Sequence, residues 1–157
     1  MPNHCHNRVT VYSANTHDVA KIKQIFEDEN CFGQIIPEPD WNNTPLTAEP
    51  AGNWLHDKRG EVGELPVPVE EYGISYRFKS TDKPDDRWYD WRLANWDTKW
   101  DAYDVVVTED DPESTEIEFN TAWSPPEAVC SALREQYPDL SVSWFYDEPG
   151  CEIAGYL

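Results

Sequence analysis

The sequence is poor in basic residues, in glycine and in long apolar runs. Its 157 residues include 12 Lys and Arg against 31 Asp and Glu, which gives a formal net charge of −19. Proteins that bind a nucleic-acid phosphate backbone need a basic surface, so the shortage of Lys and Arg argues against nucleic-acid binding. It argues equally against adhesion to an anionic membrane surface. No apolar run approaches the roughly 20 residues that cross a bilayer, so we expect no membrane-spanning helix.

The chain also lacks the motifs of common catalytic and cofactor sites. Its seven glycines form no phosphate-binding loop, dinucleotide fingerprint or nucleophile elbow. Its four cysteines form no C-x-x-C pair, so we expect separate reduced thiols, with Cys130 as a small core residue of a helix. His4 and His6 share one face of a strand, but two ligands do not close a metal site. We therefore predict no catalytic residue, no metal site and no cofactor.

Aromatic residues are abundant in spite of the low apolar content. Eight Trp, eight Tyr and five Phe argue against the disorder that high net charge alone would suggest. A chain near 150 residues buries about 68–70% of its unfolded surface, so it needs no disulfide or metal to fold. Residues 1–6 lack the apolar segment of a signal peptide, and we expect an intracellular, cytoplasmic protein.

Charge is distributed unevenly along the chain. Residues 1–80 hold 7 basic and 12 acidic residues, a net of −5, whereas residues 81–157 hold 5 basic and 19 acidic residues, a net of −14. From Asp101 onward the only basic residue is Arg134. The acidity therefore belongs mainly to the second half of the chain.

The N-terminal segment has the periodicities of a strand followed by a helix. Residues 5–13 alternate, so that odd-numbered side chains face one side and even-numbered ones the other. Asn15 or Thr16 is the expected cap of the helix. Its apolar stripe consists of Val19, Ile22, Ile25 and Phe26.

The middle of the chain has little periodicity. Residues 31–72 hold six of the thirteen prolines and predict a long irregular insertion. We place this insertion at about residues 31–100, between the first helix and the second core strand. Within it, residues 72–78 predict an extra strand or a helix fragment, and residues 79–87 predict a polar loop.

The C-terminal half predicts a hairpin. Residues 103–108 alternate, with Tyr103 and Val107 on one face, and residues 116–123 form a second alternating strand. The acidic segment 109–114 is the expected turn between them.

A helix and two strands follow the hairpin. Ser124 is the expected helix cap, with Pro125 at the first helical position and Glu127 three residues after the cap. Residues 140–146 alternate as a strand, and residues 153–157 form a short final strand after a Pro-Gly turn.

Without the insertion and the last strand, the predicted order is β-α-β-β-α-β. This order is typical of the ferredoxin-like α+β fold, an antiparallel sheet with two helices on one face. We therefore predict a single ferredoxin-like domain over residues 1–157, with the long Pro-rich irregular insertion.

Several segments resemble a known family. They are residues 2–11, 32–39, 91–102, 121–126 and 148–156, of which 91–102 is the most specific. Together they resemble the YubB-like proteins of bacteriophages and conjugative plasmids, which carry a ferredoxin-like domain. The resemblance implies a mobile-element origin and the cytoplasm of a host cell. The resemblance implies no active-site residues in this chain, because the family has no established reaction.

At one position the chain departs from the family pattern. Members often have Gly where this chain has Asp97. Asp tolerates the left-handed backbone conformation better than most residues, so we expect the turn to be retained.

A dense cluster of aromatic and basic residues is the first candidate binding site. Aromatic rings interleaved with Arg and Lys can bind a protein partner, line a small-molecule pocket or stack on the bases of a single-stranded nucleic acid, of which the net charge makes the last the least favoured. The alternative is that the rings pack in the core, with Arg92 in an ion pair. The cluster consists of Trp88, Trp91, Arg92, Asn95, Trp96, Lys99 and Trp100.

The acidic surface of the predicted hairpin is the second candidate. Such a surface can imitate DNA phosphates and bind a basic nucleic-acid-binding protein, with association that weakens as salt rises. The alternative is general solubility, or adaptation to a salt-rich cytoplasm. The residues are Asp104, Glu109, Asp110, Asp111, Glu113, Glu116 and Glu118.

These observations favour a non-enzymatic accessory protein of a phage or related mobile element that binds a host or viral protein. An acidic DNA mimic is a narrower form of this hypothesis, and we expect no direct nucleic-acid or membrane partner. The alternative is a small-molecule-binding protein or enzyme with a pocket lined by the Trp, Arg and Asn cluster.

Overall fold

The computed structural model describes residues 3–41 and 87–157. Contacts divide the chain into two compact units. Unit 1 comprises Met1–Pro37 with Trp96–Leu157, and unit 2 comprises Glu38–Asn95. Most of the predicted insertion, including the run at residues 72–78, lies outside the described residues, so its irregular structure stays a prediction.

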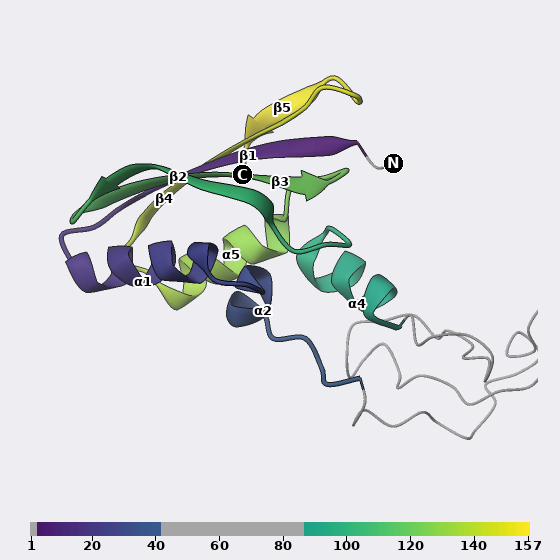
Figure 1. The fold of residues 1–157 in the computed structure, drawn as a ribbon, viewed down its shortest axis with the longest axis horizontal. Helices are drawn as coiled ribbons and strands as arrows, with labels where there is room; N and C mark the ends of the chain where they lie inside the picture. The colour runs from purple at the N-terminus through teal and green to yellow at the C-terminus, as the bar shows by residue number, and fades with distance from the viewer. Residues whose placement is uncertain (1–2, 42–86) are drawn as a thin grey trace, which may run out of the picture. The chain divides into compact units, whose positions relative to one another are not determined.

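Unit 1 is built on an antiparallel sheet of five strands (Figure 1). The strands lie side by side in the order β2-β3-β1-β4-β5. The first four reproduce the strand order of a ferredoxin-like fold, and β5 extends the sheet beyond β4. Their bounds are β1 His4–Tyr12, β2 Tyr103–Asp111, β3 Ser114–Ala122, β4 Ser141–Glu148 and β5 Ile153–Tyr156.

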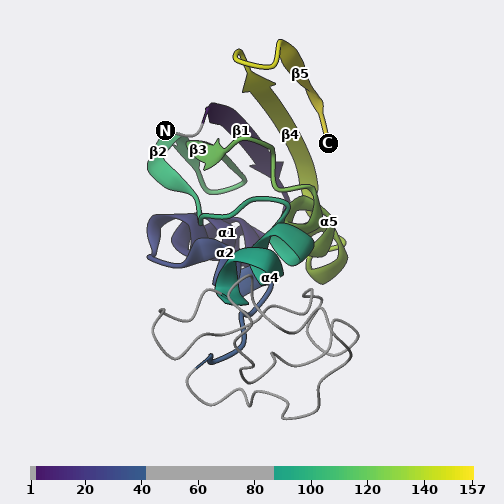
Figure 2. The ribbon, with the colours of Figure 1, turned by 90° about the vertical axis from the view of Figure 1, so that its right-hand side faces the viewer.

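Helices cover one face of this sheet. In Figures 1 and 2, α1 (Thr16–Glu27) and α5 (Glu127–Gln136) lie on the same side, together with the short α2 (Cys31–Ile35). Asn15 caps α1, where its side chain accepts a hydrogen bond from the backbone N–H of His17. The predicted apolar stripe of α1 is buried against the sheet. The sheet and helices confirm the predicted α+β ferredoxin-like fold.

Aromatic rings fill the space between the sheet and the helices. Phe119 of β3 lies 5.2 Å from Phe26 and 5.6 Å from Trp144 between ring centroids. The indole N–H of Trp144 donates to Oδ1 of the buried Asn7 at 3.0 Å, and the Asn7 amide donates to the Thr121 hydroxyl at 2.9 Å. Because each buried polar group here has a partner, the core accommodates an amide without an unpaired donor.

The backbone at Asp97 retains the left-handed conformation, with φ of 62°. Its carboxylate also accepts a hydrogen bond at 2.8 Å from the backbone N–H of Ala128, the second residue of α5. The predicted cap at Ser124 was wrong. The helix begins at Glu127 with Pro126 as N-cap, and Ser124 instead donates its hydroxyl to the Asp97 carbonyl. A residue distant in sequence therefore caps α5.

Three other local predictions need correction. The segment at residues 31–35 is a helix rather than irregular chain, and Arg87 begins a helix, α4 (Arg87–Trp96), rather than ending a loop. Tyr103 does not share a face with Val107, because the pairing with β3 shifts register between Tyr103 and Val106. Asp104 has a φ of 54° at this bulge, which turns Tyr103 to the opposite face.

No helix among the described residues is long and apolar enough to cross a membrane.

Candidate functional site: the open face of the sheet

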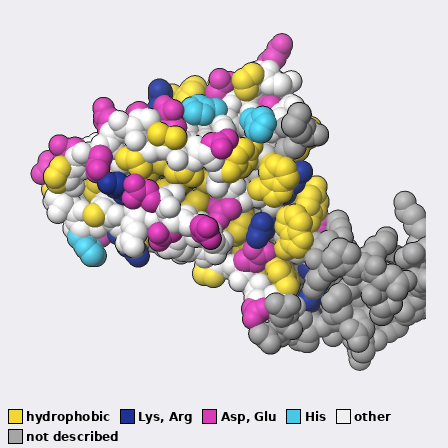
Figure 3. All heavy atoms as spheres, in the orientation of Figure 1, with side chains coloured by type: hydrophobic (Ala, Val, Ile, Leu, Met, Phe, Trp, Pro, Cys, Tyr) yellow, Lys and Arg dark blue, Asp and Glu magenta, His cyan; other side chains and the backbone are white. Residues whose placement is uncertain are grey.

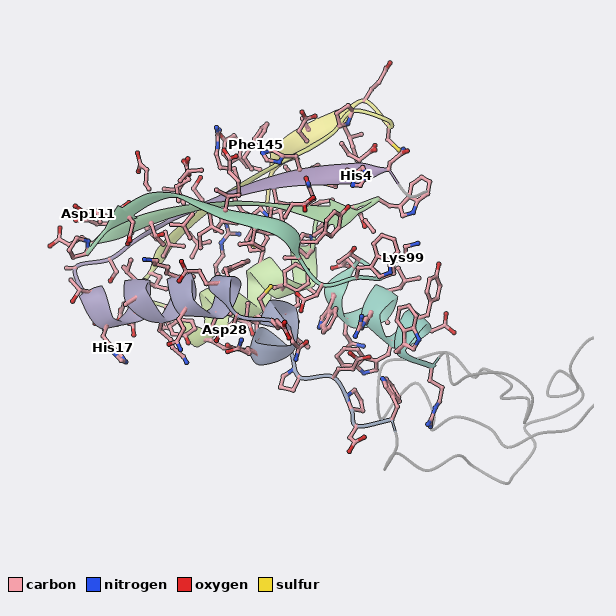
Figure 4. The ribbon with its side chains drawn as sticks, viewed as in Figure 1. His4, His17, Asp28, Lys99, Asp111 and Phe145 are labelled. Atoms are coloured by element: carbon pink, nitrogen blue, oxygen red, sulfur yellow. The ribbon has the colours of Figure 1, made fainter. Side chains whose placement is uncertain are left out.

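One face of the five-stranded sheet carries no helix among the described residues, and we call it the open face. On β1 its residues are the even-numbered ones from His4 to Tyr12, which are exposed or half-buried, whereas the odd-numbered ones are buried. Figure 4 shows His4 and Phe145 on this side, with His17 of α1 on the other. The register adds Tyr103, Val106, Glu109, Glu116, Glu118, Asn120, Asp147, Ala154 and Tyr156.

Exposed apolar side chains lie along this face. The exposed fractions are 54% for Tyr12, 56% for Val106 and 69% for Tyr156. The Tyr156 ring packs on Phe145 with centroids 5.2 Å apart, and the Arg8 guanidinium lies 5.5 Å from the Phe145 centroid. The face thus has aromatic surface available for contact, and its arginine rests on a ring.

Two carboxylates of the open face oppose each other directly. Glu109 of β2 pairs in register with Glu116 of β3. The Glu116 carboxylate accepts hydrogen bonds from the hydroxyls of Thr108 at 2.8 Å and Thr10 at 3.3 Å. Within the described chain, neither glutamate forms an ion pair with Lys or Arg. A like-charged pair directly across two strands destabilises a sheet, so this arrangement works against folding.

Further acids extend the charge along the same face. Glu118 lies two residues from Glu116, and its carboxylate is 3.9 Å from Nε2 of His6. Asp104, at the bulge of β2, accepts a hydrogen bond from the Asn120 amide at 3.2 Å. Figure 3 shows acidic side chains spread over the hairpin end of the sheet, with few Lys or Arg among them.

The remaining predicted acids lie elsewhere on the hairpin. Asp110 points to the helix side, where its carboxylate is 2.6 Å from Nζ of Lys23. This ion pair lies in a groove of about 430 Å³ between α1 and the hairpin. At the tip, Asp111 accepts a hydrogen bond from the backbone N–H of Glu113 at 3.0 Å. The structure therefore groups Asp104, Glu109, Glu116 and Glu118 on one face and separates Asp110 from them.

A second group of side chains surrounds the start of β1. Nδ1 of His4 is 2.6 Å from the Tyr103 hydroxyl. Burial, and secondarily the negative charge of Asp104, raise the pKa of Tyr103. The Tyr103 ring also lies 6.2 Å from that of Trp100. No group of three or more His, Cys, Asp or Glu suited to hold a metal ion occurs in the parts of the chain at 3–41 and 87–157.

The predicted Trp cluster is divided between the two units. Its members in unit 2 lie on α4, and those in unit 1 lie at the end of α4 and in the following loop. The unit 2 members are Trp88, Trp91, Arg92 and Asn95, and the unit 1 members are Trp96, Lys99 and Trp100.

Within unit 2, contacts already hold the polar members of the cluster. Arg92 donates two hydrogen bonds to one Glu38 oxygen, at 2.9 and 2.7 Å, and its guanidinium lies 5.1 Å from the Trp88 centroid. The Asn95 amide donates to the backbone carbonyl of Trp91 at 2.9 Å. The Trp91 side chain itself is buried.

Within unit 1, the cluster has one core residue and two accessible ones. Trp96 is fully buried, packs against Phe32 at 5.8 Å and donates to the Ile36 carbonyl at 3.1 Å. Lys99 lies 4.3 Å from the centroid of Trp100, whose exposed fraction is 38%. Only Lys99 and Trp100 of these three have surface that a partner can contact.

Residues that the sequence reasoning missed are those that the register brings to the open face. Arg8, Phe145, Asp147 and Tyr156 lie on strands whose alternation was recognised. The alternation of each strand already separates these side chains from the buried ones, but only the register between strands brings them together on one face.

The comparisons with known proteins support the fold. Residues 94–157 match the family model described as "Ferredoxin-like domain in Api92-like protein". The crystal structure of a protein api92 from Yersinia pseudotuberculosis is similar, with a TM-score of 0.50 and 11% sequence identity over 99% of this chain and 93% of that chain. At this identity the likeness concerns the fold alone. No curated protein matches the chain in sequence. The narrower resemblance to YubB-like proteins stays a prediction.

Proposed function

We propose that this protein acts by binding a basic protein through the open face of its sheet, as an accessory protein of a phage or related mobile element. The observation that carries the proposal is the opposed pair Glu109 and Glu116, with Glu118 beside it. Such a pair costs folding free energy in the isolated protein, and a Lys or Arg from a partner would relieve that cost. Groups retained at the expense of stability are typical of functional surfaces.

The apolar side chains of the open face support a protein partner. Tyr12, Val106 and Tyr156 are each more than half exposed, and they flank the acidic residues. Protein interfaces combine aromatic contacts with a polar rim, and Tyr is among the residues that contribute most to binding. Complementary charge around such contacts accelerates association and makes it salt-dependent.

A bait experiment with two triple variants tests the site. The open-face variant carries Glu109→Gln, Glu116→Gln and Glu118→Gln. The control variant removes the same number of charges from exposed positions of the helix side, with Glu27→Gln, Glu135→Gln and Asp139→Asn. Glutamine at position 116 keeps one oxygen that accepts from a threonine hydroxyl, and its amide N–H can donate to the other hydroxyl, so the hairpin is expected to stay folded.

The proposal predicts that basic proteins from a bacterial lysate are retained by the wild type and by the control, and are lost from the open-face variant. Equal loss from both variants would show binding by net charge alone, and retention by the open-face variant would contradict the proposed site. DNA mimicry, the narrower form, further predicts that the retained protein binds nucleic acid and that duplex DNA displaces it.

A further inference from the structure

The two edges of the sheet are protected very differently. The β2 edge has register shifts after Tyr103 and after Val107, and it carries several carboxylates. Bulges and charges of this kind prevent an edge strand from pairing with another chain. The β5 edge, Ile153–Tyr156, has neither charge nor proline, and it pairs with β4 without a register shift. In Figures 1 and 2, β5 is the outermost strand of the sheet.

The hydrogen-bond pattern shows which backbone groups of β5 face outward. The Leu157 N–H donates to the Trp144 carbonyl at 3.0 Å. Inward bonding alternates along an antiparallel strand, so Gly155 and Ile153 also bond toward β4. The N–H and C=O groups of Ala154 and Tyr156 therefore point away from β4. Within the described residues these outward groups have no partner.

The outward edge of β5 is complementary to itself. If two copies pair antiparallel about Gly155, Ala154 of one copy lies opposite Tyr156 of the other. Each such pairing exchanges both backbone hydrogen bonds, and the large Tyr side chain meets a small Ala on the open face. In the same register, Ile153 lies opposite Leu157. An isologous contact of this kind closes as a dimer and stops there.

Charge also favours a second copy at this edge. The chain has 27% charged residues, yet residues 153–157 have none. Two copies can therefore approach here without placing like charges in direct opposition. Ile153 and Tyr156 expose 44% and 69% of their surface, which is apolar area available for burial.

We propose that this protein self-associates through antiparallel pairing of β5 with β5 of a second copy, which joins the two sheets into one. The pairing is independent of the basic partner proposed above, and the two depend on salt in opposite ways. Binding of a basic partner weakens as salt rises. The dimer strengthens, because salt screens the repulsion between two copies that each carry −19.

Sedimentation velocity on the wild type and two variants tests the proposal. A contact limited to one strand pair is small, so the dimer is expected to form between micromolar concentrations and about 1 mM. Ala154→Pro removes an outward N–H from each copy but leaves the bonds to β4, since edge strands tolerate proline at such positions. It should weaken the dimer by about tenfold or more. Ala154→Val keeps the N–H and should leave the dimer intact.

Amide hydrogen exchange of the wild type gives a readout that does not depend on the proline variant. The amides of Ala154 and Tyr156 should become protected as concentration rises, whereas those of Ile153 and Gly155 should be protected throughout. Raising salt from about 50 mM to about 500 mM should shift the equilibrium toward the dimer. A protein that stays monomeric at about 1 mM, or a dimer in which Ala154 and Tyr156 exchange freely, would overturn the proposal.

Discussion

Removal of the repulsion between Glu109 and Glu116 should stabilise the protein. Side chains directly across two strands are about 5.5 Å apart. At that separation two unit charges in water repel by about 0.6 kcal/mol at about 10 mM salt, and by about 0.1 kcal/mol at about 1 M salt. Glu109 is the residue to change, because Glu116 also accepts hydrogen bonds from Thr10 and Thr108.

Glu109→Gln should therefore raise the free energy of unfolding by about 0.6 kcal/mol at low salt, and Glu109→Lys by about twice that, since an attraction replaces the repulsion. For a protein of this size the corresponding increases in Tm are about 1–2 °C and 2–4 °C. Thermal unfolding followed by circular dichroism at low and high salt measures both. Glu113→Gln at the hairpin tip is the control for the general effect of lowering the net charge.

The reasoning would be refuted if Glu109→Gln destabilised the protein, or if its effect equalled that of Glu113→Gln. It would also be refuted if the gain persisted undiminished at about 1 M salt, because a screened Coulomb repulsion must fade there.

Three further predictions concern the caps and thiols of unit 1. Asp97→Ala should lower the free energy of unfolding by about 2 kcal/mol, from loss of the α5 cap and the cost of the left-handed backbone, whereas Asp97→Gly should lose only about half of that. Urea unfolding ranks the variants: equal losses would contradict the backbone cost, and an undiminished stability of Asp97→Gly would contradict the capping role. A thiol reagent should label the native protein at Cys151 alone, because Cys151 is exposed and the other three cysteines are buried. Burial raises the pKa of Cys5 to about 11 and also raises the pKa values of Cys31 and Cys130. Glu148→Gln should accelerate the labelling of Cys151, since the hydrogen bond to Glu148 raises the pKa of that thiol. Hydrogen bonds from the Cys151 thiol and nearby backbone N–H groups lower the pKa of Glu148. The ionised Glu148 carboxylate therefore stabilises the folded protein above pH 4.5, and this stabilisation is lost as pH falls through the folded-state pKa. The free energy of unfolding of Glu148→Gln should depend less on acid pH than that of the wild type, and an unchanged pH dependence would argue against this contribution.

Local sequence periodicity was sufficient to predict most of the helices and strands of the fold. The alternation of residues 5–13 and the expected cap at Asn15 or Thr16 predicted β1 and α1, because both depend on neighbours in sequence. The order of elements along the chain predicted the ferredoxin-like arrangement, and the first four strands in the sheet, β2-β3-β1-β4, agree with it.

The predictions that failed depend on contacts between distant residues. The cap of α5 comes from Asp97, 31 residues before the amide that it binds. The short helix α2 is held in part by Asp101, whose carboxylate accepts from the Phe32 N–H at 3.0 Å. Neither contact has a signal within a local sequence window.

In the candidate site too, local sequence predicts some features and contacts between distant residues determine the others. Sequence alternation placed Glu116 and Glu118 on the outward side of their strand, but only the register shows that Glu109 opposes Glu116. The register also turns Asp110 toward Lys23 on α1. The register shift between Val107 and Glu109 decides these positions, and such a bulge has no reliable sequence signature.

The most direct test of the central claim is a map of where a cationic chain binds. An octalysine peptide titrated into the isotopically labelled protein at low salt should perturb the backbone amides of β2 and β3 around Glu109, Glu116 and Glu118. The same titration of the open-face triple variant should lose those shifts, while the control triple variant should retain them. Shifts centred on the acids of α1 and α5, or unchanged by the open-face substitutions, would contradict the assignment of the binding surface to the open face of the sheet.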